Sequence, residues 1–377
     1  MAVARADVVI IGAGIVGAAV AHRLSSVGKR VHVVGTAMAG GATGAGMGHI
    51  LVLDESPELF AFTRAGKASW HALAPELPAN CEWHQSGTLW VAENEGQRLA
   101  AVDMGRRLLG GGVDAQLVEA GELERLEPAL RPGLAGGLRI ADDATIYQPA
   151  AARFLLRRAV ARGGRVQLGI SVTAVEDGRV NLADGSSIEC EQVVLASGVA
   201  TADLLGDRLP VGVGPKKGQL IITERTNLRV RHHLVELGYT QSVGQQEGAS
   251  VAFNVQPRMS GQLLIGSSRA YVGGREFDRE LAARMLNRSF AFLPGLREVA
   301  ALRAWTGIRC ASKDGRPLIG PIDTRGRILV ATGHEGYGIT TSLVTGDLIA
   351  AWLGEGDLPA YAEHFTPHLA RREKACA

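Results

Sequence analysis

Residues 7–34, DVVIIGAGIVGAAVAHRLSSVGKRVHVV, constrain the fold more than any other part of the chain. An apolar strand pattern leads into the GxGxxG glycines Gly12, Gly14 and Gly17, and a helical pattern and a second strand follow. Between the strand and the helix, the first two glycines let a pyrophosphate approach the bare backbone at the N-terminus of the helix. The third glycine lets the helix pack closely on the strand. GxGxxG alone is weak evidence, but in this setting it predicts a dinucleotide-binding βαβ unit.

The second predicted strand ends without the residue that usually completes such a unit. Position 35 is glycine, where an Asp or Glu ordinarily holds the adenosine ribose. We therefore expect Thr36, backbone groups or water to hold the ribose. Loss of the charge-assisted pair weakens binding by about 1.5–3 kcal/mol, so we expect the dinucleotide to be partly lost on purification.

Length and composition indicate a globular, enzyme-sized chain, long enough for two domains, rather than a nucleic-acid-binding protein. The chain has 377 residues, 46% of them hydrophobic and 21% charged, and a formal net charge of only +2. One basic run, Arg225, Arg229, Arg231, His232 and His233, is expected on a solvated surface. No basic face that would bind nucleic acid is predicted.

The cysteines give no sign of a metal site. Cys81, Cys190, Cys310 and Cys376 are scattered without CxxC or CxxxC spacing, which argues against zinc, an iron–sulfur cluster or a disulfide framework. We expect a cytoplasmic protein without a signal peptide or transmembrane segment, so that any membrane contact is peripheral.

Further along the chain, strands outnumber helices. Strands are predicted over 83–93 and 138–149, and several more lie between 165 and 268. Helices are predicted over 148–164, between Pro149 and Gly163, and over 275–293. Glycine-rich turns at 40–48 and 332–338 indicate close backbone approach to one large ligand from two sides.

Five further segments carry a family resemblance. They are GATGAGMG (41–48), VVLASGV (193–199), PKKGQL (215–220), RAWTGIRCASKDGRPLIGP (303–321) and TGHEGYGITTSLVTGDLIA (332–350). With GAGIVG, and in this order, they resemble the FAD-dependent amine oxidoreductases of the D-amino-acid oxidase, glycine oxidase and sarcosine oxidase superfamily over nearly the whole chain. GHEGYGITTS and LLIGSSR look most like the D-amino-acid and D-hydroxyproline dehydrogenase branch, which includes hydrogen cyanide synthase and octopine oxidase subunits.

The resemblance implies a mixed α/β fold of two domains. A Rossmann-like FAD-binding domain of the glutathione-reductase type is expected from residues 1–80, 146–212 and 306–377. A substrate-binding domain on a mixed, largely antiparallel sheet is expected from residues 81–145 and 213–305.

The resemblance also implies which residues bind FAD, with Met47, Gly48 and His49 along the flavin near N5. Cys310 is displaced from the position at which some relatives attach the flavin, so we expect non-covalent FAD and no metal. The expected cofactor residues are Gly12, Gly14, Ile15, Val16, Gly17, Gly35, Thr36, Ala42, Thr43, Met47, Gly48, Val172, Ala196, Gly198, Gly307, Gly333, His334, Glu335, Gly336, Tyr337, Gly338, Ile339 and Thr340.

Arg309 falls at the family position that binds the substrate carboxylate, a task suited to a planar bidentate guanidinium. His49, Asn254, His334 and Tyr337 are further expected substrate residues. Glycine oxidase has a second arginine where this chain has Gly336, and a tyrosine where it has Asn254. These departures favour a different pocket, suited to a ring or a larger side chain.

The expected reaction is oxidation of the C–N bond of a D-amino or cyclic imino acid, with D-hydroxyproline or D-proline favoured. Hydride passes to flavin N5 and an imine forms, so no catalytic residue beyond the flavin is required. A glycine or sarcosine-type oxidase that makes hydrogen peroxide is one alternative, and the flavin subunit of a hetero-oligomeric electron-transfer complex is another. The electron acceptor (quinone, electron-transfer protein or oxygen) and the choice between homo- and hetero-oligomer stay open.

Overall fold

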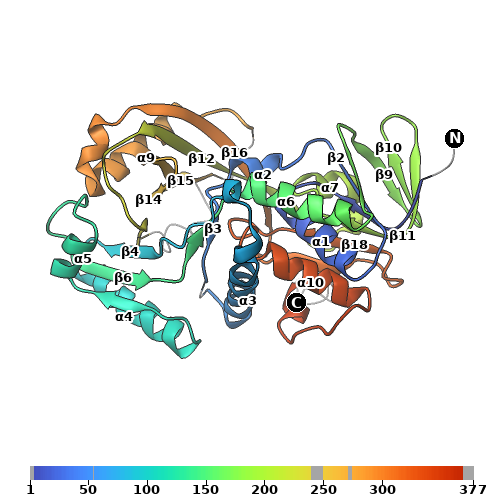
Figure 1. The fold of residues 1–377 in the computed structure, drawn as a ribbon, viewed down its shortest axis with the longest axis horizontal. Coiled ribbons are helices and arrows are strands. Elements are labelled where there is room, and N and C mark those ends of the chain that lie inside the picture. Colours follow the sequence, from blue (N-terminus) through green and yellow to red (C-terminus); the bar gives the residue numbers. More distant parts are fainter. Residues whose placement is uncertain (1–3, 54, 239–248, 271–273, 368–377) are drawn as a thin grey trace.

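A computed structural model describes residues 4–53, 55–238, 249–270 and 274–367. Two lobes, each built on its own sheet, lie side by side along the long axis of the molecule (Figure 1). The first sheet has the order β17-β18-β11-β1-β2-β8. Its strands are β17 (Leu318–Pro321), β18 (Ile328–Thr332), β11 (Ser187–Leu195), β1 (Ala4–Ile11), β2 (Val31–Gly35) and β8 (Arg165–Leu168).

The centre of the first sheet is parallel and buried on both faces. Strands β18, β11, β1, β2 and β8 run parallel, whereas β17 is antiparallel to β18. β9 (Val172–Glu176) and β10 (Arg179–Leu182) extend β11 as an antiparallel meander. Because both faces of a parallel sheet are covered, its strands are continuous runs of apolar residues. On β1, Val8, Val9 and Ile10 have no exposed surface.

Helices build the core on one face of this sheet. α1 (Ile15–Ser26), α3 (Pro57–Leu73), α6 (Gln148–Ala161) and α10 (Ser342–Trp352) share one apolar cluster with β1 and β2. The opposite face packs on the β9–β10 meander and α7 (Ala200–Leu205). The predicted βαβ unit is thus confirmed as β1–α1–β2.

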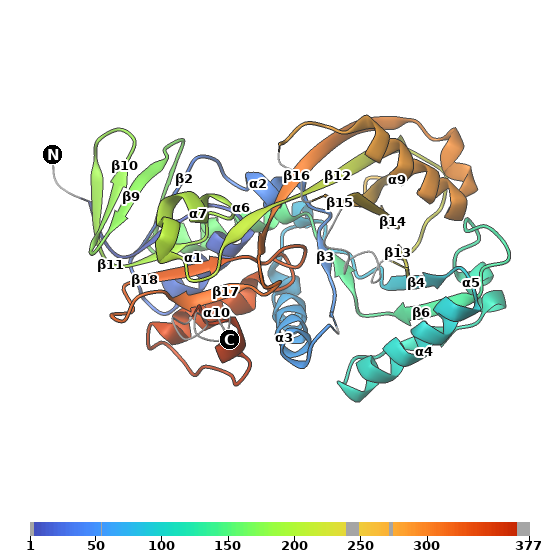
Figure 2. The same ribbon diagram turned by 180° about the vertical axis from the view of Figure 1, so that it is seen from behind.

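The second sheet is antiparallel except where β13 pairs with β4. Its order is β16-β12-β15-β14-β13-β4-β6-β5. The strands are β16 (Ala301–Ser312), β12 (Val213–Arg225), β15 (Gln262–Ala270), β14 (Ala249–Pro257), β13 (His233–Glu236), β4 (Thr88–Ala92), β6 (Gly136–Ile140) and β5 (Gln116–Val118). Figure 2 shows the long strands β12 and β16 reaching from this lobe toward the first.

Helices cover both faces of the second sheet. α5 (Ala120–Leu126) and α9 (Arg279–Phe292) contribute to the core on one face, and α4 (Glu95–Gly110) to the core on the other. Shorter elements are α2 (Gly41–Ala45), β3 (His49–Ile50), β7 (Ala144–Thr145), α11 (Ala362–Phe365) and the 3₁₀ turns Ala74–Glu76, Ala79–Cys81, Gly206–Arg208 and Pro294–Glu298. The mixed α/β fold is confirmed, whereas the exact domain limits stay a prediction.

Several elements differ from the sequence-based expectation. The glycine-rich segment 40–48, predicted as a turn, contains the short helix α2. α9 begins at Arg279 rather than at 275, because the Asp278 side chain caps it by accepting the Leu281 N–H. α10 begins at Ser342, after the glycines of the 332–338 turn.

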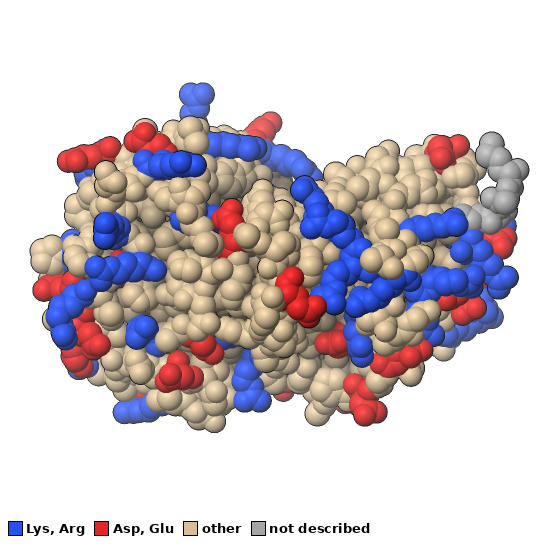
Figure 3. All heavy atoms as spheres, in the orientation of Figure 1, with Lys and Arg blue, Asp and Glu red and all other residues tan. Residues whose placement is uncertain are grey.

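The basic run at 225–233 is only partly a solvated surface. Arg225, Arg229 and Arg231 are exposed, but His232 and His233 are buried. His232 Nδ1 lies 2.7 Å from the buried carboxylate of Glu127. Figure 3 shows basic and acidic side chains interspersed over one face of the molecule, in line with a net charge near zero.

Within the described residues, no helix is both long enough and apolar enough to cross a membrane. The same residues contain no group of three His, Cys, Asp or Glu side chains placed to hold a metal ion. Cys81, Cys190 and Cys310 are buried free thiols, and Cys376 lies outside the described residues.

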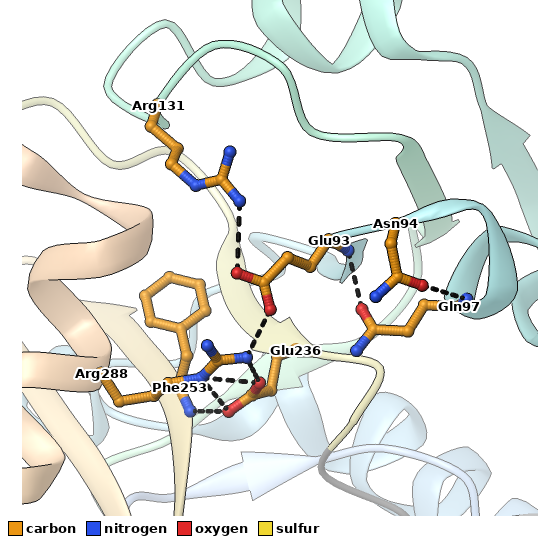
Figure 4. Close-up of polar contacts among 7 residues, drawn as sticks. All are labelled: Glu93, Asn94, Gln97, Arg131, Glu236, Phe253 and Arg288. Atoms are coloured by element: carbon orange, nitrogen blue, oxygen red, sulfur yellow. Dashed lines mark hydrogen bonds and ion pairs between the residues drawn. The ribbon is translucent and has the colours of Figure 1, made fainter.

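An ion-pair network ties α9 to the second sheet (Figure 4). Arg288 binds Glu236 on β13 and lies 2.8 Å from Glu93, which also pairs with Arg131 at 3.2 Å. Glu236 also accepts the backbone N–H of Phe253. The Arg288 guanidinium lies 4.7 Å from the ring centroid of Phe292, so one side chain neutralises two carboxylates and packs on the core.

We expect Arg288→Ala to lower the free energy of unfolding by about 2–3 kcal/mol, because it leaves two carboxylates without their shared cation in a site only partly open to water. Urea denaturation measures this. Arg284→Ala on the exposed side of the same helix is the control and should change stability by less than about 0.5 kcal/mol. Equal effects of the two variants would contradict the assigned role.

Candidate active site

In the glycine turn after β1, backbone atoms of neighbouring segments lie in close contact. A Cβ at position 12 would lie 2.4 Å from the Ala196 carbonyl oxygen, and Gly12 has φ of +117°. A Cβ on Gly17 would lie 1.9 Å from the Gly12 carbonyl oxygen. Only glycine fits either position, so the turn, α1 and the end of β11 form one packed unit.

The N-terminus of α1 is held by the 41–46 segment. Gly14 is the N-cap residue and has no side chain to cap the helix, but the Thr43 hydroxyl accepts the Ile15 N–H at 3.0 Å. Gln148 at the start of α6 donates to the Thr43 and Gly46 carbonyls at 2.9 and 2.8 Å. Because the Thr43 hydroxyl accepts one bond, its hydrogen can be donated to an anion at the helix N-terminus.

This turn opens into a cavity of about 580 Å³, within the usual range for ligand sites. The cavity wall brings together segments from both lobes. Among the predicted site residues, those lining the cavity are Gly12, Gly14, Ile15, Val16, Gly35, Thr36, Ala42, Thr43, Met47, Gly48, His49, Val172, Ala196, Gly198, Gly307, Arg309, Gly333, His334, Glu335, Gly336, Gly338 and Ile339.

Four predicted site residues do not line the cavity. Gly17 packs α1 on the turn, and Asn254 is bonded to His233. The Tyr337 hydroxyl donates to the Gly315 carbonyl at 3.0 Å. Thr340 donates to the His49 carbonyl at 3.1 Å and accepts the Leu51 N–H at 3.3 Å, which ties the 332–341 turn to β3. Their direct ligand roles stay predictions, and what the structure supports is positioning.

At one end of the cavity, Gly35 stands beside the glycine turn. A Cβ there would lie 3.3 Å from the Ala13 nitrogen, which is tight but lacks the severe overlap found at Gly12. Thr36 and Ser171 also line this end, so hydroxyl groups are present where the usual acid is missing.

Arg309, on β16 of the second sheet, also lines the cavity. Its Nη1 donates to the Ser268 carbonyl at 3.3 Å. A Cβ on Gly218 of the neighbouring strand would lie 2.7 Å from the same Nη1. The guanidinium therefore lies across a glycine, which leaves it room beside the cavity.

Near Arg309, the largely buried carboxylate of Glu335 pairs with two more cations. Glu335 Oε1 lies 3.3 Å from Lys216 and 3.4 Å from Arg269, and its Oε2 accepts the Gly336 N–H at 2.6 Å. Burial alone would raise the pKa of Glu335, but the charges of Arg269, Arg309 and Lys216 outweigh it and lower that pKa to about 2. Glu335 is thus ionised at neutral pH, in a left-handed conformation with φ of +48°.

Two uncharged titratable side chains, His334 and Cys310, also line the cavity. Burial lowers the pKa of His334 to about 4, and its Nε2 lies 3.1 Å from the Thr345 hydroxyl. Burial raises the pKa of the Cys310 thiol, which contacts the Thr332 hydroxyl. A protonated, buried thiol is a poor nucleophile, which fits a cofactor bound without a covalent link.

Sequence reasoning missed residues that complete this site. Lys216, Gly218 and Arg269 surround Glu335 and Arg309, and Gln148 holds the 41–46 segment. PKKGQL and LLIGSSR contain the first three residues, and both segments were noted for their family resemblance without a role for these residues. Gln148 lies where the predicted strand 138–149 overlaps the predicted helix 148–164, and it gave no distinct signal.

The comparisons with known proteins agree with this geometry. The family model of the DAO FAD-dependent oxidoreductases matches residues 7–352. The chain is a DAO-family FAD-dependent oxidoreductase. It is 30% identical to the glycine oxidase of Geobacillus kaustophilus, with 92% of each chain covered. It is 26% identical to the hydrogen cyanide synthase subunit HcnC of Pseudomonas aeruginosa, with 97% of this chain and 96% of that protein covered.

The crystal structure of the Geobacillus kaustophilus glycine oxidase superposes with a TM-score of 0.86 at 25% identity, covering 97% of this chain and 99% of that one. FAD is the cofactor of this family, and the cavity fits it. The glycine turn, the N-terminus of α1 and the Thr43 hydroxyl would hold the pyrophosphate. The other end, beside Met47, Gly48 and Gly307, would hold the flavin ring.

We expect Gly35→Glu to tighten FAD binding by about tenfold, because a carboxylate at this point can accept both ribose hydroxyls. Titration of apoprotein with FAD measures the dissociation constant. Gly35→Gln is the matched control, since it adds the same bulk beside Ala13 without the charge. If the two variants bind FAD equally, the ribose site has been rebuilt around the glycine.

We expect Glu335→Gln to lower the free energy of unfolding at pH 7 by on the order of 2–3 kcal/mol. The folded-state pKa of about 2 lies below the ordinary value of 4.5, so the carboxylate stabilises the fold above pH 4.5. This contribution is lost as the pH falls from 4.5 through 2. Urea denaturation at pH 7 and pH 3.5 should show the difference between the variants shrinking, and the exposed Glu122→Gln should show no difference at either pH.

Proposed function

We propose that this oxidoreductase oxidises the C–N bond of an amino or cyclic imino acid, with D-amino and D-imino acids of the D-proline and D-hydroxyproline class as favoured substrates. The observation that carries the proposal is the Arg309 guanidinium, because Arg309 lines the same cavity as residues 47–49, which are expected beside the flavin. Bound FAD supplies the hydride acceptor for the carbon that bears the nitrogen.

Arg309 is suited to hold a carboxylate in one orientation. Gly218 leaves the guanidinium room, and the Ser268 carbonyl fixes one of its nitrogens. A planar fork of donors binds a carboxylate bidentately, which orients the neighbouring Cα. Correct placement of that carbon is the main task left to the protein when a cofactor carries the chemistry.

Glu335 supports this role by positioning rather than by contact with substrate. Its charge lies among Lys216, Arg269 and Arg309, so it limits the repulsion between these cations and helps hold them in place. A free carboxylate substrate then meets a preformed site.

Proton transfer places a further limit on the substrate. The His334 pKa of about 4 leaves that side chain neutral and weakly basic at physiological pH. The substrate nitrogen must therefore reach the site without its proton or lose it to solvent. As the pH rises, a larger fraction of an amino or imino acid has an unprotonated nitrogen. The rate of C–N oxidation should therefore rise toward alkaline pH.

Anaerobic reduction of the bound flavin, followed as loss of its yellow absorbance, tests the proposal directly. D-Proline, cis-4-hydroxy-D-proline, D-alanine, D-serine, glycine, sarcosine and the L-enantiomers form the panel. Reduction by at least one D-amino or D-imino acid is expected. If no amine in the panel bleaches the flavin, the proposed function is wrong.

We expect Arg309→Met to lower kcat/KM for a carboxylate substrate by at least about 100-fold, equivalent to about 2.7 kcal/mol of lost binding in the transition state. Pyrrolidine, which lacks the carboxylate, distinguishes this from general damage, because its slow oxidation should change little. Arg303→Met, at an exposed position on the same strand, is the matched control. An equal loss for proline and pyrrolidine would rule out carboxylate binding by Arg309.

A glycine or sarcosine-type oxidase is the second candidate, favoured by the 30% identity to a glycine oxidase. Gly336 and Asn254 speak against it, because the resemblance places an arginine and a tyrosine at these positions in glycine oxidase. Turnover in air with and without an artificial acceptor separates the two. Hydrogen peroxide formation at nearly the full rate would favour the oxidase.

A third candidate is a flavin subunit that is inactive alone, favoured by the similarity to a hydrogen cyanide synthase subunit over almost the whole of both chains. Absence of turnover by the isolated chain, together with a partner that restores it, would support this candidate. Full activity of the isolated chain would rule it out.

A further inference from the structure

The short helix α7, which follows β11, contributes one face to the wall of the cavity. Three of its residues, Ala200, Asp203 and Leu204, line the cavity. Residues three and four positions apart lie on the same side of a helix, so these three form a single surface. The carboxylate of Asp203 therefore belongs to the cavity wall, although the sequence gave no reason to assign it a role.

The start of α7 is attached to the segment that contacts the glycine turn. Ser197 Oγ lies 3.0 Å from Thr201 Oγ1, and the Thr201 N–H donates to the Gly198 carbonyl at 3.1 Å. The residue before Ser197 is Ala196, whose carbonyl oxygen would lie 2.4 Å from a Cβ on Gly12. The helix therefore begins beside the turn that is expected to hold the pyrophosphate of FAD.

The end of α7 packs on β9, which begins beside Gly35. Arg208, just after the helix, donates to the Val175 carbonyl of β9 at 3.1 Å, and Leu205 shares an apolar cluster with Val175. Just before β9, the Ile170 N–H donates to the Gly35 carbonyl at 3.4 Å. α7 thus extends from the glycine turn to the segment that lies beside Gly35, the position where the usual acid is missing.

This part of the cavity suits the adenosine half of FAD. Three apolar residues line it, Ile170, Val172 and Leu204, and Thr36 and Ser171 add hydroxyl groups. Ligand sites are mostly apolar, with a few polar groups that fix the orientation of the ligand. An adenine ring can pack on the apolar residues, and its ribose needs polar partners.

Within the described part of the chain, the carboxylates that line the cavity are those of Glu335 and Asp203. Glu335 is already paired with Lys216 and Arg269. Asp203 is exposed, and its carboxylate has no hydrogen bond or ion pair with any other described residue. Of the two, Asp203 is therefore the carboxylate that is available to a ligand.

We propose that Asp203 takes the place of the acid missing from the end of β2 and accepts a hydrogen bond from the adenosine half of FAD. Adenosine has neutral donors in its ribose hydroxyls and its adenine amino group, and a carboxylate is a strong acceptor for either. The acid then comes from the helix after β11 instead of from β2. This inference concerns the cofactor and does not depend on which amine the enzyme oxidises.

Titration of the apoprotein with FAD, followed by flavin fluorescence, tests the proposal without turnover. We expect Asp203→Ala to raise the Kd for FAD by about tenfold, and Asp203→Asn, which keeps a neutral acceptor, to raise it by about threefold. Asp207→Ala is the matched control, because Asp207 is also exposed and follows the same helix but does not line the cavity. An unchanged Kd in Asp203→Ala would overturn the proposal.

ADP shows whether the effect lies in the adenosine half, because it has the adenosine and the pyrophosphate but no flavin. ADP competes with FAD for the apoprotein, and its inhibition constant should rise in Asp203→Ala by about the same factor as the Kd for FAD. If the Kd for FAD rises while the inhibition constant of ADP does not, Asp203 acts elsewhere and the proposal is wrong.

An FAD analogue with hypoxanthine in place of adenine distinguishes the two kinds of donor, since a carbonyl oxygen replaces the amino group. If Asp203 binds the amino group, Asp203→Ala should not weaken binding of this analogue. If Asp203 binds the ribose, the loss should persist with the analogue and should shrink in the Gly35→Glu background, where a second acid is available. Either result supports the proposal and identifies the donor.

Thermal unfolding separates cofactor binding from support of the helix. Asp203 lies in the first turn of α7, where an acidic side chain can also stabilise a helix. We expect Asp203→Ala to change the Tm of the apoprotein by less than about 2 °C and to reduce the rise in Tm on addition of FAD. A fall of several degrees in the apoprotein, together with an unchanged Kd for FAD, would assign Asp203 to the helix and contradict the proposal.

Discussion

The structure depends on the contact between the turn after β1 and the end of β11. At Gly12 and Gly17 the backbone of one segment lies where the Cβ of another would be, so helix, turn and strand are in direct contact. This contact brings the N-terminus of α1 to the carboxyl edge of the parallel sheet. The partial positive charge of the helix end, the Thr43 hydroxyl and the cavity then coincide at that edge.

The residues around the glycine turn and those around Arg309 differ in the kind of interaction that they can make. Near the glycine turn, the cavity presents backbone and hydroxyl groups to a ligand. Glycine stands even at position 35, where a dinucleotide-binding unit usually has an acid. The end near Arg309 depends on full charges, and there a single buried carboxylate keeps neighbouring cations close together. The first arrangement recognises a shape common to many dinucleotides. We propose that the second defines which anion enters and how it is oriented.

The sequence predicted those features of the site that lie within one short segment better than those that depend on contacts between distant segments. Gly12 and Gly17 reveal their role within a single strand–turn–helix unit, and Pro149 and Gly163 mark α6 in the same way. Arg309 was identified only through resemblance to a family. Lys216, Arg269 and Glu335 come from separate strands and a distant turn, and no local pattern indicates that they meet. The burial of His233 was missed because a run of charges was judged by composition rather than by the alternation of strand faces.

The hydroxyl of Thr340, which bridges the His49 carbonyl and the Leu51 N–H, has a consequence for how the protein is made. It joins the first fifty residues of the chain to a turn near its C-terminal end. During synthesis the glycine turn and α1 leave the ribosome early, but the cavity wall stays open until the 332–341 turn has emerged. Tight capture of the cofactor therefore comes only after this turn has emerged, when the strands of both sheets have already been synthesised.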